Sequence, residues 1–182
     1  MQKATTRQQL FKLILTAILI SLNFVLERIV PSYKILSQDI NFGFIAIAFA
    51  ASFLGIPYAI AVAGLGDLLG SLLMPFGPYF PGFTATNCVY GLILALALYK
   101  NATLPKVVLG VLVNKIVCSM LLNNLWIAML YYGGVHTFFA VLATRLPGIA
   151  IMTAVETIVF VLIFWRKSKI RVLLDKNLKR II

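Results

Sequence analysis

The chain has 182 residues, of which 62% are hydrophobic and 12% charged, and its mean hydropathy is +1.00. Soluble domains carry roughly 45–50% apolar and ~25% charged residues, so a water-soluble fold could not bury this much apolar surface. The net charge of +11 does not indicate nucleic acid binding, because the basic residues gather at the chain ends and in one internal turn. The positive-inside rule places basic residues of membrane proteins in such segments.

One bilayer crossing needs ~20 apolar residues, so a chain of this length has room for about six. The sequence therefore predicts an all-α integral membrane protein with six transmembrane helices, forming a single membrane domain over residues 1–182. Cys88 and Cys118 both lie in apolar runs without a CxxC pair, which argues against a disulfide framework or a zinc site. No small-residue cleavage site follows the first apolar run, so we expect an uncleaved first helix.

The first predicted helix covers residues 10–30, and Pro31 marks its end. A polar segment from Ser32 to Asp39 follows as a predicted loop. The next stretch, from Ile40 to Gly66, carries no charge and is too long for one crossing. Gly55-Ile56-Pro57 interrupts it, which predicts two helices, 42–55 and 57–73.

Residues 74–83 contain three prolines and two glycines among aromatic residues, which excludes a regular helix and predicts an ordered loop or a re-entrant segment. Three further helices are expected at 83–99, 107–131 and 139–165. A turn from Lys100 to Lys106 and a loop from Tyr132 to His136 separate them. A basic tail, 166–182, completes the chain.

The distribution of Lys and Arg predicts the orientation. Three lie in the N-terminal tail, two in the Lys100 to Lys106 turn and seven in the C-terminal tail, and six crossings would put all three segments on one side. The positive-inside rule assigns that side, with both termini, to the cytoplasm. The Ser32 to Asp39 loop, the proline-rich segment and the His136 loop would then face outward.

Catalytic groups are scarce. His136 is the only histidine, and no serine or cysteine near it in sequence forms a nucleophile and base arrangement. We therefore predict no catalytic residue and no bound metal, and keep an intramembrane enzyme or an unrelated channel-like protein as alternatives.

Ionisable residues inside membrane helices are costly, so each is a candidate for ligand binding or for a structural ion pair. Six such residues stand in or at the edges of the predicted helices: Glu27, Arg28, Asp67, Lys115, Arg145 and Glu156.

These residues have different expected roles. Lys115 is expected to reach the cytoplasmic interface with its long side chain, and Glu156 to hold the last helix through a partner. Asp67 lies among glycines, and it either pairs within the bundle or binds a ligand. Arg145 suits a carboxylate or a planar heterocycle.

The helix predicted at 107–131 places Ser119, Asn123, Trp126 and Leu130 at spacings of four, three and four, which would put them on one face. An amide beside an indole suits a flat polar ring, although Asn123 could instead pack helices while Trp126 lies in the interfacial aromatic belt. Phe83, Asn87 and Tyr90 share a face of the preceding helix in the same manner.

Several segments carry a resemblance to a known family. They are Gly66-Asp67-Leu68-Leu69-Gly70, the run from Phe76 to Thr84, Leu122-Asn123-Asn124-Leu125-Trp126 with Leu130-Tyr131-Tyr132-Gly133, and Arg145 at the start of the last helix. In order and spacing these resemble the substrate-binding S components of energy-coupling factor (ECF) transporters, and among them the folate-specific, FolT-like subfamily.

The resemblance implies a six-helix fold with an outward-facing vitamin pocket, gated by the loop between the first two helices. It implies no cofactor, and folate or a reduced folate as the ligand; another water-soluble vitamin, such as pantothenate, a queuosine precursor or cobalamin, is the alternative. The implied partners are the transmembrane coupling subunit, EcfT, and two ATPases, with Ala17 and Ser21 contacting the coupling subunit. The expected ligand-binding residues are Arg28, Asp67, Tyr79, Phe80, Phe83, Asn87, Asn123, Trp126, Tyr131 and Arg145.

Overall fold

The computed structural model describes residues 6–30, 33–35, 38–75, 77–99 and 103–165. Three helices continue directly into π-helical turns: α1 (Thr6–Phe24) into η1 (Val25–Ile29), α2 (Phe44–Phe49) into η2 (Ala50–Leu54), and α5 (Leu104–Asn114) into η3 (Lys115–Asn123). The last of these turns leads on into α6 (Asn124–Tyr131). The other helical segments are α3 (Ile56–Leu73), α4 (Pro81–Leu98), the short η4 (Val135–Thr137) and α7 (Phe138–Trp165).

The six predicted helices are confirmed. Five are long and apolar enough to cross a membrane, namely Arg7–Ile29, Ile56–Leu73, Pro81–Leu98, Leu104–Tyr131 and Val135–Phe164. The sixth, Phe44–Leu54, is apolar but shorter. The predicted basic tail 166–182 lies outside the described residues.

The predicted break between the second and third helices is confirmed at Gly55. This residue has φ 104°, in a region that residues with a side chain rarely adopt, and Pro57 then stands in the first turn of α3. Pro81 likewise stands at the beginning of α4, so this helix begins two residues before the predicted start at 83. Proline is tolerated there because the first turn has no intrahelical partner for its missing N–H.

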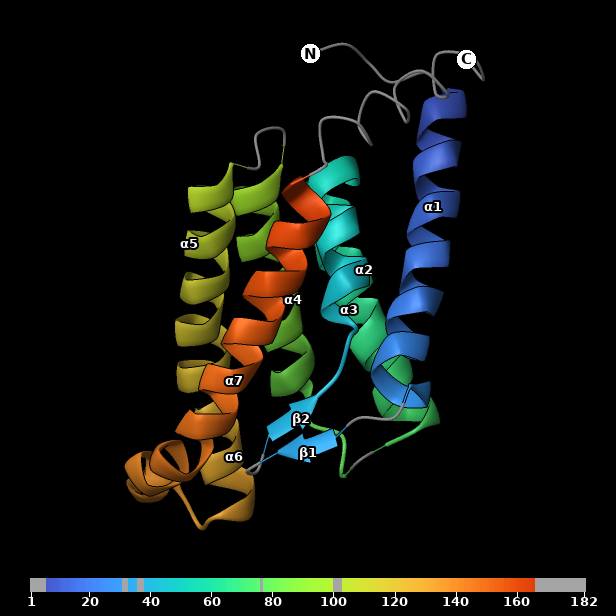
Figure 1. Ribbon diagram of the computed structural model, residues 1–182. Coiled ribbons are helices and arrows are strands. Elements are labelled where there is room, and N and C mark those ends of the chain that lie inside the picture. The colour runs from blue at the N-terminus through green and yellow to red at the C-terminus, as the bar shows by residue number, and fades with distance from the viewer. Residues whose placement is uncertain (1–5, 31–32, 36–37, 76, 100–102, 166–182) are drawn as a thin grey trace.

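The predicted loop from Ser32 to Asp39 is wrong in part, because two short strands form there. Strand β1 (Tyr33–Ile35) pairs with β2 (Gln38–Ile40) in an antiparallel hairpin, with Lys34 opposite Asp39. Three-residue strands are too short for an alternating pattern to be recognised in the sequence. The hairpin lies across one end of the helical bundle (Figure 1).

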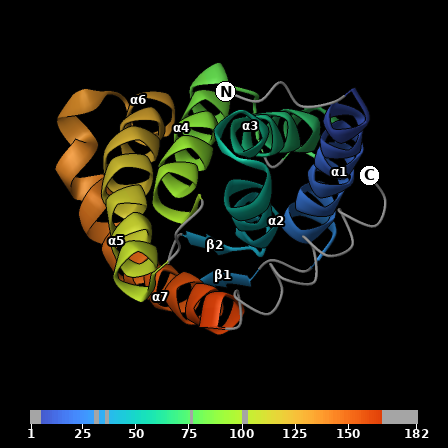
Figure 2. The ribbon, with the colours of Figure 1, turned by 90° about the horizontal axis from the view of Figure 1, so that it is seen from above.

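The helices run side by side, and their connections fall at two ends of the bundle (Figures 1 and 2). The beginning of α1, the end of α4, the beginning of α5 and the end of α7 lie at one end. The hairpin, the segment between α3 and α4, and η4 lie at the other, which we call the hairpin end. The hairpin, the segment between α3 and α4, and η4 therefore lie together, as predicted for the outward segments. The two basic tails and residues 100–102 lie outside the described residues, and the assignment of the two ends to cytoplasm and exterior stays a prediction.

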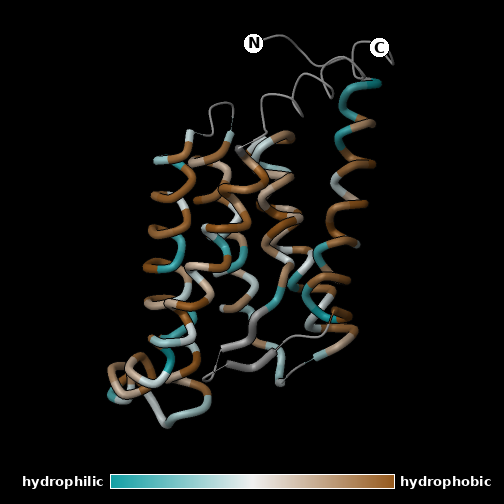
Figure 3. The backbone as a smooth tube through the Cα atoms, in the orientation of Figure 1, coloured by the Kyte–Doolittle hydropathy of each residue, from teal (hydrophilic) through white to brown (hydrophobic). Residues whose placement is uncertain are grey.

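Small residues let the central helices pack closely. A Cβ added at Gly91 of α4 would lie 2.6 Å from the carbonyl oxygen of Ala59 on α3, so only glycine permits this approach. Leucines such as Leu96, Leu109 and Leu162 point outward on the other faces, where hydrocarbon would surround them. Apolar residues dominate most of the helices, and polar residues occur more often toward the hairpin end (Figure 3).

Candidate ligand-binding site

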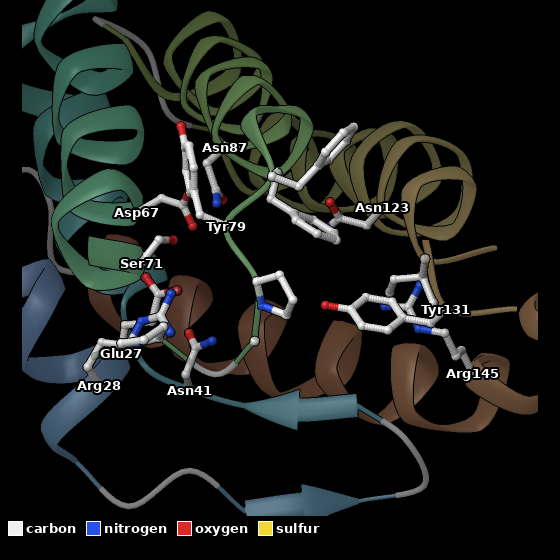
Figure 4. A pocket seen from close by; sticks show the side chains of 16 residues that line it. Glu27, Arg28, Asn41, Asp67, Ser71, Tyr79, Asn87, Asn123, Tyr131 and Arg145 are labelled. Carbon is white, nitrogen blue, oxygen red and sulfur yellow. Dashed lines mark ion pairs between the residues drawn. The ribbon is translucent and has the colours of Figure 1, made fainter. Parts of the chain in front are cut away.

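A cavity of about 330 Å³ lies at the hairpin end, among η1, α3, the proline-rich segment, α4, η3, α6 and α7. Polar side chains reach it from two sides (Figure 4). Glu27, Arg28 and Ser71 lie on one side, and Asn123, Tyr131 and Arg145 lie on the other. We call these the α1 wall and the α6 wall.

Nine of the ten residues expected to bind a ligand line this cavity: Arg28, Asp67, Tyr79, Phe80, Phe83, Asn87, Asn123, Tyr131 and Arg145. They come from seven helical or loop segments, so the fold brings together residues as distant in the sequence as Arg28 and Arg145. Their contact with a ligand remains a prediction.

The tenth residue, Trp126, does not line the cavity. Its ring packs against Phe80 with a centroid separation of 5.4 Å, and its Nε1–H donates to the hydroxyl of Thr86 at 3.0 Å. Phe80 lines the cavity. Trp126 therefore supports a wall residue from behind.

The predicted common face of Asn123, Trp126 and Leu130 differs from the structure. The residues that line the cavity from this helix are Asn123, Ile127 and Tyr131, at spacings of four and four, whereas Leu130 is 45% exposed. Residues four apart lie above one another on an α-helix, so these three form one stripe. Trp126 does not belong to this stripe, because its ring lies behind Phe80.

On the α1 wall, Glu27 and Arg28 form an ion pair, with 3.9 Å between Glu27 Oε1 and Arg28 Nη2. Arg28 Nη1 also donates to the carbonyl of Met74 at 3.1 Å, which connects η1 to the end of α3. Both residues stand in the π-helical turn Val25–Ile29, and π-bulges occur frequently at functional sites.

Asp67 pairs within the bundle, as one of its two expected roles required, and ligand binding by it stays a prediction. It is 5% exposed, and its Oδ2 accepts a hydrogen bond of 2.6 Å from the hydroxyl of Thr84. The Thr84 oxygen also lies 3.4 Å from the hydroxyl of Tyr79. Asp67 therefore ties α3 to α4 and at the same time lines the cavity.

Lys115 does not extend to an interface, so that prediction is wrong. Its Nζ lies 2.5 Å from Glu156 Oε1, and the two side chains are 8% and 3% exposed. A buried ammonium needs a carboxylate partner, because without one its charge would be left uncompensated in the interior. The prediction that Glu156 holds the last helix through a partner is confirmed.

Some cavity residues were not expected from the sequence, among them Asn41 and Ser71. Ser71 stands four residues after Asp67, a helical spacing that could have identified it. Asn41 directly follows β2, and its position depends on a hairpin that the sequence did not predict. Glu27 was a candidate only as an ionisable group within a helix.

Ala17 and Ser21 lie elsewhere. Both are exposed on α1, and the Ser21 hydroxyl donates to the carbonyl of Ala17 at 3.1 Å. Neither lines the cavity among the described residues. The small-residue pair is thus available for a contact outside the bundle.

The chain matches the ECF transporter, substrate-specific component family over residues 11–164. The chain belongs to this family. It is therefore a transporter subunit rather than an enzyme, and a multi-pass protein of the bacterial plasma membrane. S components of this family pair with the coupling subunit EcfT and with ATPase subunits.

Individual relatives agree with this assignment. The S component is 31% identical over 148 residues to a folate transporter FolT of Clostridium novyi, covering 81% of this chain and 84% of the relative. It is 28% identical over 132 residues to a folate transporter FolT of Leuconostoc mesenteroides, covering 71% and 68%. Its fold is similar to a crystal structure of FolT bound with folic acid, with a TM-score of 0.72, 28% identity and coverage of 81% and 88%.

Proposed function

We propose that this S component captures folate or a reduced folate outside the cell and delivers it inward together with EcfT and two ATPases. The observation that carries the proposal is the cavity at the hairpin end, where aromatic rings, amides and two arginines meet. The relatives named folate transporters support the choice of vitamin.

The chemistry of the cavity suits the parts of a folate. A folate joins a flat, hydrogen-bonding pteridine to an aminobenzoyl ring and a glutamate with two carboxylates. Tyr79, Phe80 and Phe83 offer aromatic surface for flat rings. Arg28 and Arg145 offer guanidinium groups, which bind carboxylates through paired hydrogen bonds.

The two arginines approach the cavity from opposite walls (Figure 4). A ligand whose carboxylates interact with either one leaves its rings directed toward the interior, where Asn87 and Asn123 offer amide groups. A pocket with few polar groups at fixed positions among aromatic side chains is typical of small-molecule sites.

The proposal is tested by isothermal titration of the purified protein in detergent with folic acid, 5-methyltetrahydrofolate, pantothenate and cobalamin. We expect tight binding of a folate and no measurable heat for the other two vitamins. Arg145→Ala should weaken folate binding about tenfold or more, because a buried charge-assisted contact is lost. Leu162→Ala serves as the control, since Leu162 is 68% exposed and far from the cavity residues in sequence.

Mass spectrometry of the ligand that co-purifies with the protein provides an independent readout. A folate bound in one-to-one ratio would support the proposal. Binding of pantothenate or cobalamin with no binding of either folate would contradict it and would identify the chain as an S component for another vitamin.

A further inference from the structure

The helical segment Leu104–Tyr131 carries a row of cavity residues at a constant spacing of four: Lys115, Ser119, Asn123, Ile127 and Tyr131. The last three line the cavity described above. The first three line a smaller cavity of about 100 Å³, which adjoins the larger one at Asn123. One side of the helix therefore faces the two cavities all the way from Lys115 to Tyr131.

A regular α-helix would not keep this row on one side. It turns by ~100° per residue, so a step of four residues overshoots a full turn by ~40°. Four such steps would place Tyr131 ~160° around the helix axis from Lys115, almost on the opposite side. Part of this rotation must therefore be removed between the two residues.

The π-helical stretch η3 (Lys115–Asn123) removes it. Each N–H of a π-helix bonds to the fifth residue back, so a turn takes about one residue more than in an α-helix. A step of four residues then falls slightly short of a full turn instead of overshooting it. The first two steps of the row, from Lys115 to Asn123, lie within η3, which brings Lys115 and Tyr131 to the same side of the helix.

Buried side chains fix the helix immediately before and after η3. Asn114 donates from Nδ2 to the carbonyl of Tyr90 on α4 at 3.1 Å, and Asn124 donates from Nδ2 to the carbonyl of Phe138 on α7 at 2.9 Å. Both asparagines are fully buried. The nine residues between them must therefore provide the rotation that these two contacts require. Longer π-helical stretches are rare, and π-helical turns occur frequently at functional sites.

We propose that η3 is a positioning segment, whose π-helical register directs Ile127 and Tyr131 toward the ligand while Lys115 stays paired with Glu156. With α-helical geometry throughout, the helix could keep the buried ion pair or present the α6 wall to the cavity, but not both. The proposal concerns how this helix is built, and only its affinity measurement rests on the proposed function.

Deleting one exposed residue from η3 tests the proposal. With one residue fewer, an α-helix covers nearly the same rotation as the π-helix, so both ends of the stretch should keep their contacts. Ile116 is 53% exposed and Leu121 is 51% exposed. Isothermal titration should show that deletion of either one leaves folic acid affinity within about threefold of the natural protein, because the spare residue of the π-helix is what has been removed.

The matched control is deletion of Leu112, which is 45% exposed in the α-helical segment α5. This segment has no spare residue, so the deletion turns the helix on one side of it by ~100° relative to the other and should weaken folic acid binding about tenfold or more. The three deletions remove similar side chains from the same helix, and they differ in whether the removed residue belongs to the π-helix.

A second measurement needs no ligand. In a background of Cys88→Ala and Cys118→Ser, we compare Ile127→Cys with Met129→Cys, since Met129 is 48% exposed on the outer side of the helix. A water-soluble methanethiosulfonate reagent should label Ile127→Cys faster, because a thiol forms its reactive thiolate in water and not in hydrocarbon. The same order of rates is expected after deletion of Ile116 or Leu121.

Loss of folic acid binding or of this labelling difference in both η3 deletions would overturn the proposal and leave the folate function intact. Natural affinity after deletion of Leu112 would also overturn it, since any part of the helix would then absorb a lost residue. If the natural protein does not bind folic acid, the proposed function is overturned, and the labelling rates still decide whether η3 positions the α6 wall.

Discussion

The two walls of the cavity are held in place by different physical means. On the α1 wall, two polar side chains lie directly over glycines of α3: Asn23 of α1 over Gly66, and Arg28 of η1 over Gly70. A Cβ at Gly66 would overlap the side-chain oxygen of Asn23, and one at Gly70 would lie 2.6 Å from Arg28 Nε. This wall depends on a close approach that a single methyl group would prevent.

On the α6 wall, aromatic and buried polar contacts set the position. Trp126 packs on Phe80, which meets Phe83 edge to face at 6.0 Å. The amide of Asn124, fully buried, donates to the carbonyl of Phe138 at 2.9 Å. The α1 wall therefore depends on glycines that have no side chain, and the α6 wall depends on large side chains that fill space. Adding a methyl group should disturb the first wall, and truncating a side chain should disturb the second.

The largest effect is expected for Gly66→Ala on the α1 wall. The added methyl would displace Asn23, which is 1% exposed and donates from Nδ2 to the carbonyl of Gly43 at 3.0 Å. Overpacking of this kind costs about 1–3 kcal/mol, and displacing α1 also moves Glu27 and Arg28. We expect a lower melting temperature in detergent and a loss of folate binding of more than tenfold.

The matched variant adds Asn23→Ala to Gly66→Ala, which removes the atoms that the new methyl meets. Ligand affinity should recover in part in this double variant. Leu65→Ala, on the same helix at a 47% exposed position, should leave affinity unchanged. Natural affinity and melting temperature in Gly66→Ala alone would show that α1 does not depend on this glycine.

Trp126→Ala on the α6 wall should have the next largest effect. It removes the ring behind Phe80 and the donor to Thr86, so Phe80 loses its support. Truncating a buried aromatic of a binding site often costs ~2 kcal/mol or more, and we expect folate binding about tenfold weaker by isothermal titration. Trp126→Phe keeps much of the packing and should lose less. If Trp126→Ala and Arg145→Ala both bind like the natural protein, the assignment of this cavity is wrong.

Local patterns predicted the helices, whereas most of the expected cavity residues came from the resemblance to the S components. Charge-free runs, Gly55 and the prolines predict where most helices begin and end to within a few residues of the observed positions. The close approach at Gly66 and the Lys115–Glu156 pair could not be predicted, since each joins helices that are distant in sequence. Trp126 was placed by helical spacing alone, and spacing does not tell which neighbouring ring stands in front.

A smaller effect is expected at the hairpin that spans the two walls. Strand β2 leads from the hairpin to Asn41 in the cavity and contacts α7, so a ligand in the cavity should favour the paired hairpin. Lid motions commonly accompany ligand binding. Trypsin needs locally unpaired backbone, and cutting after Lys34 should therefore be several-fold slower with folate than without it.

Lys106, in the first turn of α5 at the opposite end of the bundle, provides the internal control. Its rate of cutting should not depend on folate, which separates local closure from a general increase in stability. Equal cutting at Lys34 in both states, on folded protein with confirmed ligand binding, would remove the support for a lid.

The smallest effect on the cavity is expected for Ala17→Leu and Ser21→Leu, on the side of α1 that does not contact α3. Both residues are exposed, and their small side chains would let another helix approach closely. If EcfT contacts this face, larger side chains should reduce folate uptake in cells that also produce EcfT and both ATPases. Folate affinity of the isolated S component should stay within about twofold, because the glycine contacts of the α1 wall are unchanged. Ile18→Leu is the control, since it preserves volume on the same exposed face. Parallel loss of uptake and affinity in the two variants would mean that this side of α1 also fixes the cavity, and the separation between the two sides of the helix would not hold.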